Sequence, residues 1–148
     1  MIAKLHPVNI PMTVDTGGAY ADGDVLSQPQ FIQLPSRAGS IAGVLRGIVI
    51  ADIDNIAASI DFLLFSAAVV APANNEAVAL TDAEWATFIR RFTVADSQYT
   101  TYEDVALADV SYELYLPASF YVLPVIKTAD TFTTTSAITA NMLVEIRE

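Results

Sequence analysis

Residues 110–126 read VSYELYLPASFYVLPVI. In the first seven positions apolar and polar side chains alternate from Val110 onward, the period of two that places one kind of side chain on each face of a β-strand. Pro117 and Ala118 then predict a turn. Residues 120–126 are apolar on both faces, which indicates a strand that is covered on both sides. This stretch therefore predicts two consecutive strands of a buried sheet.

The same alternation extends in both directions along the chain. Pro11 interrupts the first predicted strand and cannot donate a ladder hydrogen bond, so we expect residues 1–15 to form an edge strand or an N-terminal arm. The remainder, 16–148, is expected to be one domain. Further strands are predicted at residues 8–14, 25–34, 41–51, 60–70 and 138–146, with an extended Thr-rich segment at 131–136.

One helix is predicted, over residues 81–92. Thr81 followed by Glu84 has the spacing of a capping box, in which each residue's side chain bonds the other's backbone N–H. Trp85, Phe88, Ile89 and Phe92 fall at the spacing of one helical face. We expect this aromatic face to pack on a sheet, with the adjacent pair Arg90 and Arg91 on the exposed side near the C-terminus.

Taken together, these elements predict a mainly β protein. About eight short strands, separated by turn signals such as Asp22-Gly23-Asp24, are typical of an antiparallel β-sandwich or jelly roll, here with one inserted helix. The strands and helices do not alternate as they do in a parallel α/β sheet.

The composition restricts the classes of partner. Hydrophobic residues make up 53% of the chain and charged residues only 16%, which favours burial of some apolar surface against other subunits. The net charge of −10 argues against nucleic-acid binding, which requires basic residues that neutralise phosphates. The longest charge-free run in the most apolar region, residues 62–75, is too short to cross a membrane, and no transmembrane segment is expected.

Few residues are suited to catalysis. The chain has no cysteine, and His6 is its one histidine, placed in a proline-containing terminal segment that is a poor platform for a general base. The acid pairs Asp22/Asp24 and Asp52/Asp54 could serve as paired glycosidase carboxylates or as a calcium-binding loop. Acids at this spacing are more typical of turns, whose backbone they hydrogen-bond. We therefore expect no enzyme activity, metal or cofactor.

Two groups of residues are candidates for contact with other molecules. The tyrosines Tyr99, Tyr102, Tyr112, Tyr115 and Tyr121 suit either a sugar-binding surface or a subunit interface, because tyrosine has an apolar face and a polar tip. The apolar strands supply the other group. Its predicted interface residues are Val8, Ile10, Met12, Phe120, Tyr121, Leu123 and Val125.

The order of these features resembles a known family. The stretches Ala19-Tyr20-Ala21-Asp22-Gly23-Asp24-Val25, Gly43–Asp52 and Ile60-Asp61-Phe62-Leu63-Leu64-Phe65 are similar to small virion proteins of tailed phages, of the head-decoration or minor-capsid type. The likeness covers most of the chain and is a pattern of strands rather than a catalytic signature. It implies a jelly-roll-like sandwich within a particle.

Two functions remain open at this point. The first is a non-enzymatic structural subunit that decorates or stabilises a phage capsid. Its partners would be further copies of itself, for example as a trimer, and a major capsid protein or another virion protein. It would be made in the host cytoplasm and then be incorporated into the phage particle. The second is a tail- or fibre-associated β-sandwich that binds a carbohydrate or a receptor.

Overall fold

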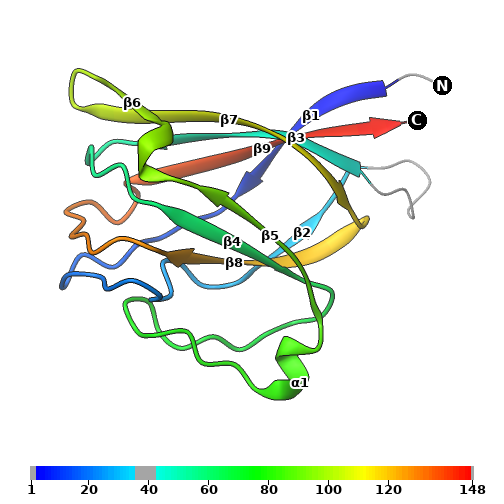
Figure 1. Ribbon diagram of the computed structural model, residues 1–148, viewed down its shortest axis with the longest axis horizontal. Coiled ribbons are helices and arrows are strands. Elements are labelled where there is room, and N and C mark those ends of the chain that lie inside the picture. The colour runs from blue at the N-terminus through cyan, green and yellow to red at the C-terminus, as the bar shows by residue number, and fades with distance from the viewer. Residues whose placement is uncertain (1–2, 36–42, 148) are drawn as a thin grey trace.

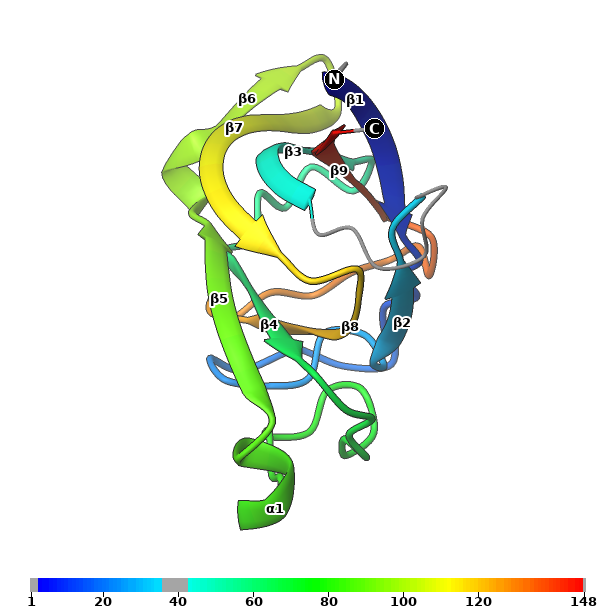
Figure 2. The same cartoon turned by 90° about the vertical axis from the view of Figure 1, so that its right-hand side faces the viewer.

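The computed structural model describes residues 3–35 and 43–147, which form a two-layer β-sandwich. Figures 1 and 2 show the two sheets face to face, with the short helix below the smaller sheet. The strands are β1 (Ala3–Ile10), β2 (Gln30–Gln33), β3 (Gly43–Asp52), β4 (Ile60–Phe65), β5 (Phe88–Val94), β6 (Tyr99–Tyr102), β7 (Val105–Leu116), β8 (Ser119–Ile126) and β9 (Ile138–Arg147). The helices are α1 (Asp82–Trp85) and the 3₁₀ turn η1 (Asp96–Gln98).

The strand order is that of a jelly roll. One sheet has the order β1-β9-β3-β7-β6 and the other has β2-β8-β4-β5. The antiparallel pairs β4–β5, β3–β7, β2–β8 and β1–β9 form one long folded ribbon, and the pairs β3–β9 and β4–β8 close it into two sheets. This connectivity defines the jelly roll. β6 is an added strand beside β7. The predicted mainly β sandwich is therefore confirmed.

The main core lies between the two sheets. Every second side chain of β4, β8 and β9 faces it, as the alternation in the sequence predicts. In β3 a register shift between Leu45 and Gly47 moves the next core position to Ile48. Tyr20 and Phe132, from loops at one end, are also fully buried and meet edge to face at 5.8 Å. The Tyr20 hydroxyl donates to the Leu26 carbonyl at 3.0 Å and accepts from the Asp15 N–H, so its polar atom is satisfied within the core.

A second, smaller core covers the outer face of the four-stranded sheet. Residues 66–81 leave β4, cross this face and return through α1 to β5. Val69 from this excursion packs with Leu123 and Val125 of β8. This explains why β8 is apolar on both of its faces.

The predicted helix 81–92 is wrong in its extent. The capping box of Thr81 and Glu84 is present, but α1 ends at Trp85 and residues 88–94 form β5 instead. In that strand Phe92 lies opposite Phe62 and stacks on it with a centroid distance of 4.9 Å. Pairing with a buried strand overrides the helical spacing of the aromatic residues, and Arg90 and Arg91 consequently lie on an edge strand.

The N-terminal segment forms an edge strand in the chain's own sheet. β1 pairs with β9 from Ala3 opposite Arg147 to Ile10 opposite Ala140, so both ends of the chain lie side by side. The regular strand ends before Pro11, and the Thr-rich segment 131–136 is irregular. Of the predicted strand 41–51, residues 41 and 42 lie outside the described range. No helix within residues 3–35 and 43–147 has the length and apolar character needed to cross a bilayer.

Candidate functional site

A row of aromatic side chains crosses the outer face of the four-stranded sheet. Cross-strand neighbours on one face of a sheet lie close enough for their rings to touch. Each strand contributes one ring at the same level of the sheet. The row runs from Phe31 on β2 through Tyr121 on β8 and Phe65 on β4 to Phe88 on β5.

Trp85 of α1 extends this row. Its ring lies 5.9 Å from that of Phe65 and 6.4 Å from that of Phe88, and these two rings are 5.7 Å apart. Phe65 is fully buried, whereas Trp85 is 42% and Phe88 41% exposed. At the other end Phe31 is 54% exposed and its ring packs on Tyr121 at 5.1 Å. The aromatic row therefore has a buried centre and two ends that are open to a partner.

Helix α1 is fixed in place by its own polar contacts. The Glu84 carboxylate accepts hydrogen bonds from the N–H of Thr81 and from the N–H of Val70 in the preceding loop. These hydrogen bonds lower the pKa of Glu84. The helix and the excursion are thereby joined, and Trp85 has a rigid support.

Most of the predicted interface residues are already covered within the chain itself. Ile10, Phe120, Leu123 and Val125 are buried within the chain's own two cores, and Val8 and Met12 pack against the main core. Their apolar pattern reflects strands covered within one chain, so they offer little surface to another subunit. Tyr121 is the exception, since it is half-buried and belongs to the aromatic row.

Sequence reasoning did not identify the exposed rings of Phe31, Trp85 and Phe88 as one surface. Trp85 and Phe88 are close in the sequence, but Phe31 is more than fifty residues away from them. Phe31 joins the same row only through strand register, which no local pattern indicates.

The five tyrosines do not share one surface. Tyr102 and Tyr115 are exposed on the five-stranded sheet, and Tyr121 lies on the other sheet. Tyr99 and Tyr112 pack against the main core. Burial raises the pKa of Tyr99, and it raises that of Tyr112 to about 12. The Tyr112 hydroxyl donates to the Thr93 carbonyl and so connects the two sheets.

The carboxylates proposed as calcium ligands all hold loops together. Asp22 forms an ion pair with Lys127 at 2.5 Å, and Asp24 accepts from the Ala21 N–H at 2.7 Å. Asp52 is buried and accepts from the N–H groups of Asp54, Ile56 and Ala57. Burial nevertheless raises its pKa.

Asp54 connects two loops that are distant in the sequence. Its carboxylate accepts four hydrogen bonds, from the N–H and the hydroxyl of both Thr133 and Thr134, at 2.8–3.1 Å. Burial alone would raise the pKa of Asp54, but these hydrogen bonds outweigh it and the pKa is lowered. The residues described contain no group of three or more side chains suited to holding a metal ion.

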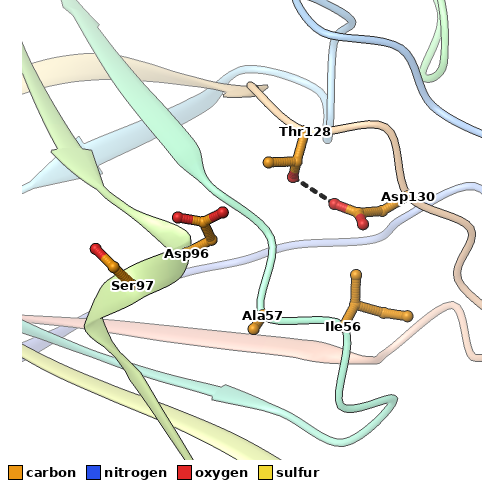
Figure 3. Close-up of a pocket in the computed structure, with 6 residues that line it drawn as sticks. All are labelled: Ile56, Ala57, Asp96, Ser97, Thr128 and Asp130. Carbon is orange, nitrogen blue, oxygen red and sulfur yellow. Dashed lines mark hydrogen bonds between the residues drawn. The ribbon is translucent and has the colours of Figure 1, made fainter.

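A shallow hollow of about 490 Å³ lies at this end of the sandwich. Figure 3 shows it between η1, the loop after β3 and the loop after β8. Asp96 and Asp130 supply its carboxylates, and the Asp130 carboxylate accepts a hydrogen bond from Thr128. The Asp130 carboxylate therefore holds its own loop, and the hollow marks the place where three connecting segments meet.

The surroundings of His6 differ from those of a catalytic histidine. It lies in β1 opposite Val144, and its Nε2 atom is buried without a hydrogen-bond partner in the described chain. A general base needs a partner that orients its ring.

Comparisons of this chain with models of protein families, with curated proteins and with solved structures give no match.

Proposed function

We propose that this protein is a non-enzymatic structural subunit of a tailed-phage particle, which decorates or stabilises the capsid through contacts between subunits. The observation that carries the proposal is the aromatic row, whose exposed ends stand on a rigid sandwich. Aromatic residues are enriched where proteins bind each other, and burying one such side chain contributes roughly 1.5–3 kcal/mol. The resemblance of the chain to decoration proteins supports the choice of particle.

The arrangement of polar groups supports the same proposal. The loop carboxylates that would be needed for hydrolysis or metal binding are already engaged. Asp24 and Asp52 accept hydrogen bonds from their own loops, Asp54 accepts them from the loop before β9, and Asp22 pairs with Lys127. The rings at the ends of the aromatic row pack on Phe65 and Tyr121 with one side only, and a large part of each remains exposed. Contact with another protein uses these exposed groups and leaves the loops unchanged.

A double substitution at both ends of the row tests the proposal. Phe31→Gln with Phe88→Gln removes two exposed rings but leaves Phe65 in place. We expect the wild-type protein to sediment with phage particles from a lysate of the producing cells, and the double variant to remain in the soluble fraction. Absence of the wild-type protein from purified particles, established by mass spectrometry, contradicts the proposal.

The control for this experiment is Tyr102→Gln, which removes an aromatic ring that is even more exposed, at 62%, from the other sheet. It is expected to sediment with particles like the wild type. Thermal unfolding of all three proteins identifies any loss caused by misfolding. Equal loss of binding in the control and in the folded double variant argues against the aromatic row as the contact surface.

A second candidate function is binding of a carbohydrate or receptor at a phage tail or fibre. It is favoured by the Phe31 end of the row, where the exposed ring packs on Tyr121 and Gln33 follows two residues later on the same strand. The Gln33 amide nitrogen donates to the Ala118 carbonyl at 3.2 Å, which holds this side chain in place. An aromatic face beside an amide is suited to a sugar ring. A glycan array probed with wild-type protein and with Phe31→Ala tests this function. Binding that the substitution leaves unchanged places the site elsewhere.

A further inference from the structure

The edge of β7 is only partly covered. β7 is twelve residues long and pairs with β3 on one side from Ala106 to Leu116. On its other side β6 pairs only with Val105–Ala108. From Asp109 to Leu116 no described strand lies on this side, and Figure 2 shows β7 continuing past the end of β6. A row of backbone groups is thus left available for another strand.

The other sheet edges carry features that oppose strand addition. β1 contains Pro7, β5 carries Arg90 and Arg91, and β2 and β6 are only four residues long. Short strands, prolines and basic side chains protect edges from pairing with other chains. The segment 109–116, with sequence DVSYELYL, contains no proline, glycine or basic residue. It carries two acids, Asp109 and Glu113, but it is the longest edge segment in the described chain without a proline, a glycine or a basic side chain.

The side chains of this segment divide by face. Asp109, Ser111, Glu113 and Tyr115 are exposed on the outer face of the sheet. On the inner face Val110 is buried, while Tyr112 and Leu114 are half-buried at the rim of the core. A strand added beside β7 would cover these two residues and extend the sheet, provided that it also alternates apolar and polar side chains.

We propose that this edge pairs with the same edge of a second copy, antiparallel about a two-fold axis that passes through Tyr112. The proposal rests on the role of a self-associating subunit and names the surface for it. Each copy supplies the alternating strand that the other lacks, as an isologous interface requires. The two five-stranded sheets become one continuous sheet across the pair.

The charges select the register. Side chains directly opposite each other must share a face, which leaves two-fold axes through individual residues. An axis at Ser111 places Asp109 opposite Glu113 of the other copy, and an axis at Glu113 places the two Glu113 side chains opposite each other. Like charges in these positions are destabilising, and the ion pair of Glu113 with Arg46 at 3.6 Å offsets only part of this repulsion, because the Glu113 side chain is 74% exposed.

The axis at Tyr112 avoids both repulsions. It places Tyr115 opposite Asp109 and Ser111 opposite Glu113 of the other copy. It also pairs all residues from 109 to 115 and leaves out only Leu116, which would fall opposite Ala108, a residue that β6 already pairs.

The net charge of −10 on each copy opposes association at long range. Salt screens this repulsion, so the dissociation constant of the pair is expected to fall as the ionic strength rises. This direction differs from that of a contact held by ion pairs, which salt weakens.

Analytical ultracentrifugation of the full chain over a range of concentrations tests the pairing. Tyr115→Glu places a second acid opposite Asp109 at two symmetric positions and should raise the dissociation constant about three- to thirtyfold. Ser111→Lys places a base opposite Glu113 and should lower it by about two- to tenfold. The matched control for Tyr115→Glu is Tyr102→Glu, since Tyr102 is 62% exposed and Tyr115 69%. The control for Ser111→Lys is Thr139→Lys, on β9 of the same sheet and two strands away from β7.

The inference is overturned if the wild-type protein is monomeric at all concentrations, or if each variant and its control shift the equilibrium equally. Far-ultraviolet circular dichroism verifies that the variants are folded. If the wild-type protein is a monomer that still sediments with particles, the pairing is contradicted and the proposed function stands. A dimer of the predicted register that is absent from particles supports the pairing and contradicts the proposed function.

Discussion

At the scale of single residues, acids and glycines in the loops and bulges hold the sandwich in shape. Asp54 joins the loop after β3 to the loop before β9 through four hydrogen bonds. Gly47 lies where the register of β3 shifts against both β7 and β9. Each of these positions gives a prediction with a defined sign.

Replacing Asp54 with Asn should reduce stability in a pH-dependent way. At neutral pH we expect the free energy of unfolding to fall by about 1–2 kcal/mol, because the amide nitrogen cannot accept hydrogen bonds. The pKa of Asp54 in the folded state lies below its ordinary value of 3.8. As the pH falls below 3.8 the unfolded chain binds the proton first, so the stabilisation by Asp54 is progressively lost.

Urea unfolding at neutral pH and at pH values below 3.8 measures this effect. The difference between the wild type and Asp54→Asn should shrink at the lower pH. Asp104→Asn is the control, since this exposed carboxylate in the turn from β6 to β7 accepts no hydrogen bond within the described chain. A difference that is independent of pH would show that the Asp54 carboxylate is not stabilised in its charged form.

Gly47→Ala should destabilise the fold for a steric reason. A Cβ atom at this position would lie 2.9 Å from the backbone oxygen of Val110 on the neighbouring strand. The strands must separate to admit it, at a cost of about 1–3 kcal/mol. Gly18→Ala is the control, because its Cβ would meet only an Asn75 side-chain atom at 3.5 Å. Urea unfolding that gives equal values for the two variants would contradict the close approach at Gly47.

At the scale of elements, β5 shows where local sequence patterns fail. Its aromatic residues have both the spacing of a helical face and the composition of a strand, and the capping box at Thr81 favours the helix. The contact that decides is the stacking of Phe92 on Phe62, which depends on a strand about thirty residues away. The alternating strands β3, β8 and β9 were predictable because each carries its own signal of burial.

Substitutions within β5 distinguish the strand from the helix that the local sequence pattern predicts. Phe92→Ala should lower the free energy of unfolding by about 3–5 kcal/mol, because it leaves a cavity in the main core. Phe88→Ala should cost only about 1 kcal/mol, since the ring is half-exposed and touches Phe65 and Trp85 alone among the aromatic rings. Chemical denaturation measures both. Equal costs are expected of a continuous helix with all these rings on one face and would contradict the strand.

The aromatic row could not be predicted from the sequence for a related reason. Tyr121 carries a visible signal as part of an apolar strand, whereas Phe31 and Phe88 differ in no local respect from core residues. Their common level on the sheet depends on the register of three strand pairs. A sequence pattern indicates which face a residue occupies along one strand, but it does not indicate the neighbour on the next strand.

At the scale of the whole molecule, the rolled ribbon determines how the chain folds. Its outermost pair, β1 with β9, joins the first and last described residues of the chain. Contacts between segments so distant in sequence form late, since the loop between them must first be closed. The wild-type chain is therefore expected to refold in the range of milliseconds to seconds that is typical of β-sandwiches.

A circular permutant tests this account of folding. A short linker joins residue 148 to residue 1, and new ends are placed between Glu103 and Asp104, two exposed residues of the turn from β6 to β7. The permutation turns the eight residue pairs of β1–β9 into a hairpin, while the four pairs of β6–β7 become distant. Because the average separation of contacts decreases, refolding measured by stopped-flow fluorescence should be faster than in the wild type. If the permutant reaches the same folded state but refolds at an equal or lower rate, closure of the β1–β9 pair does not limit folding.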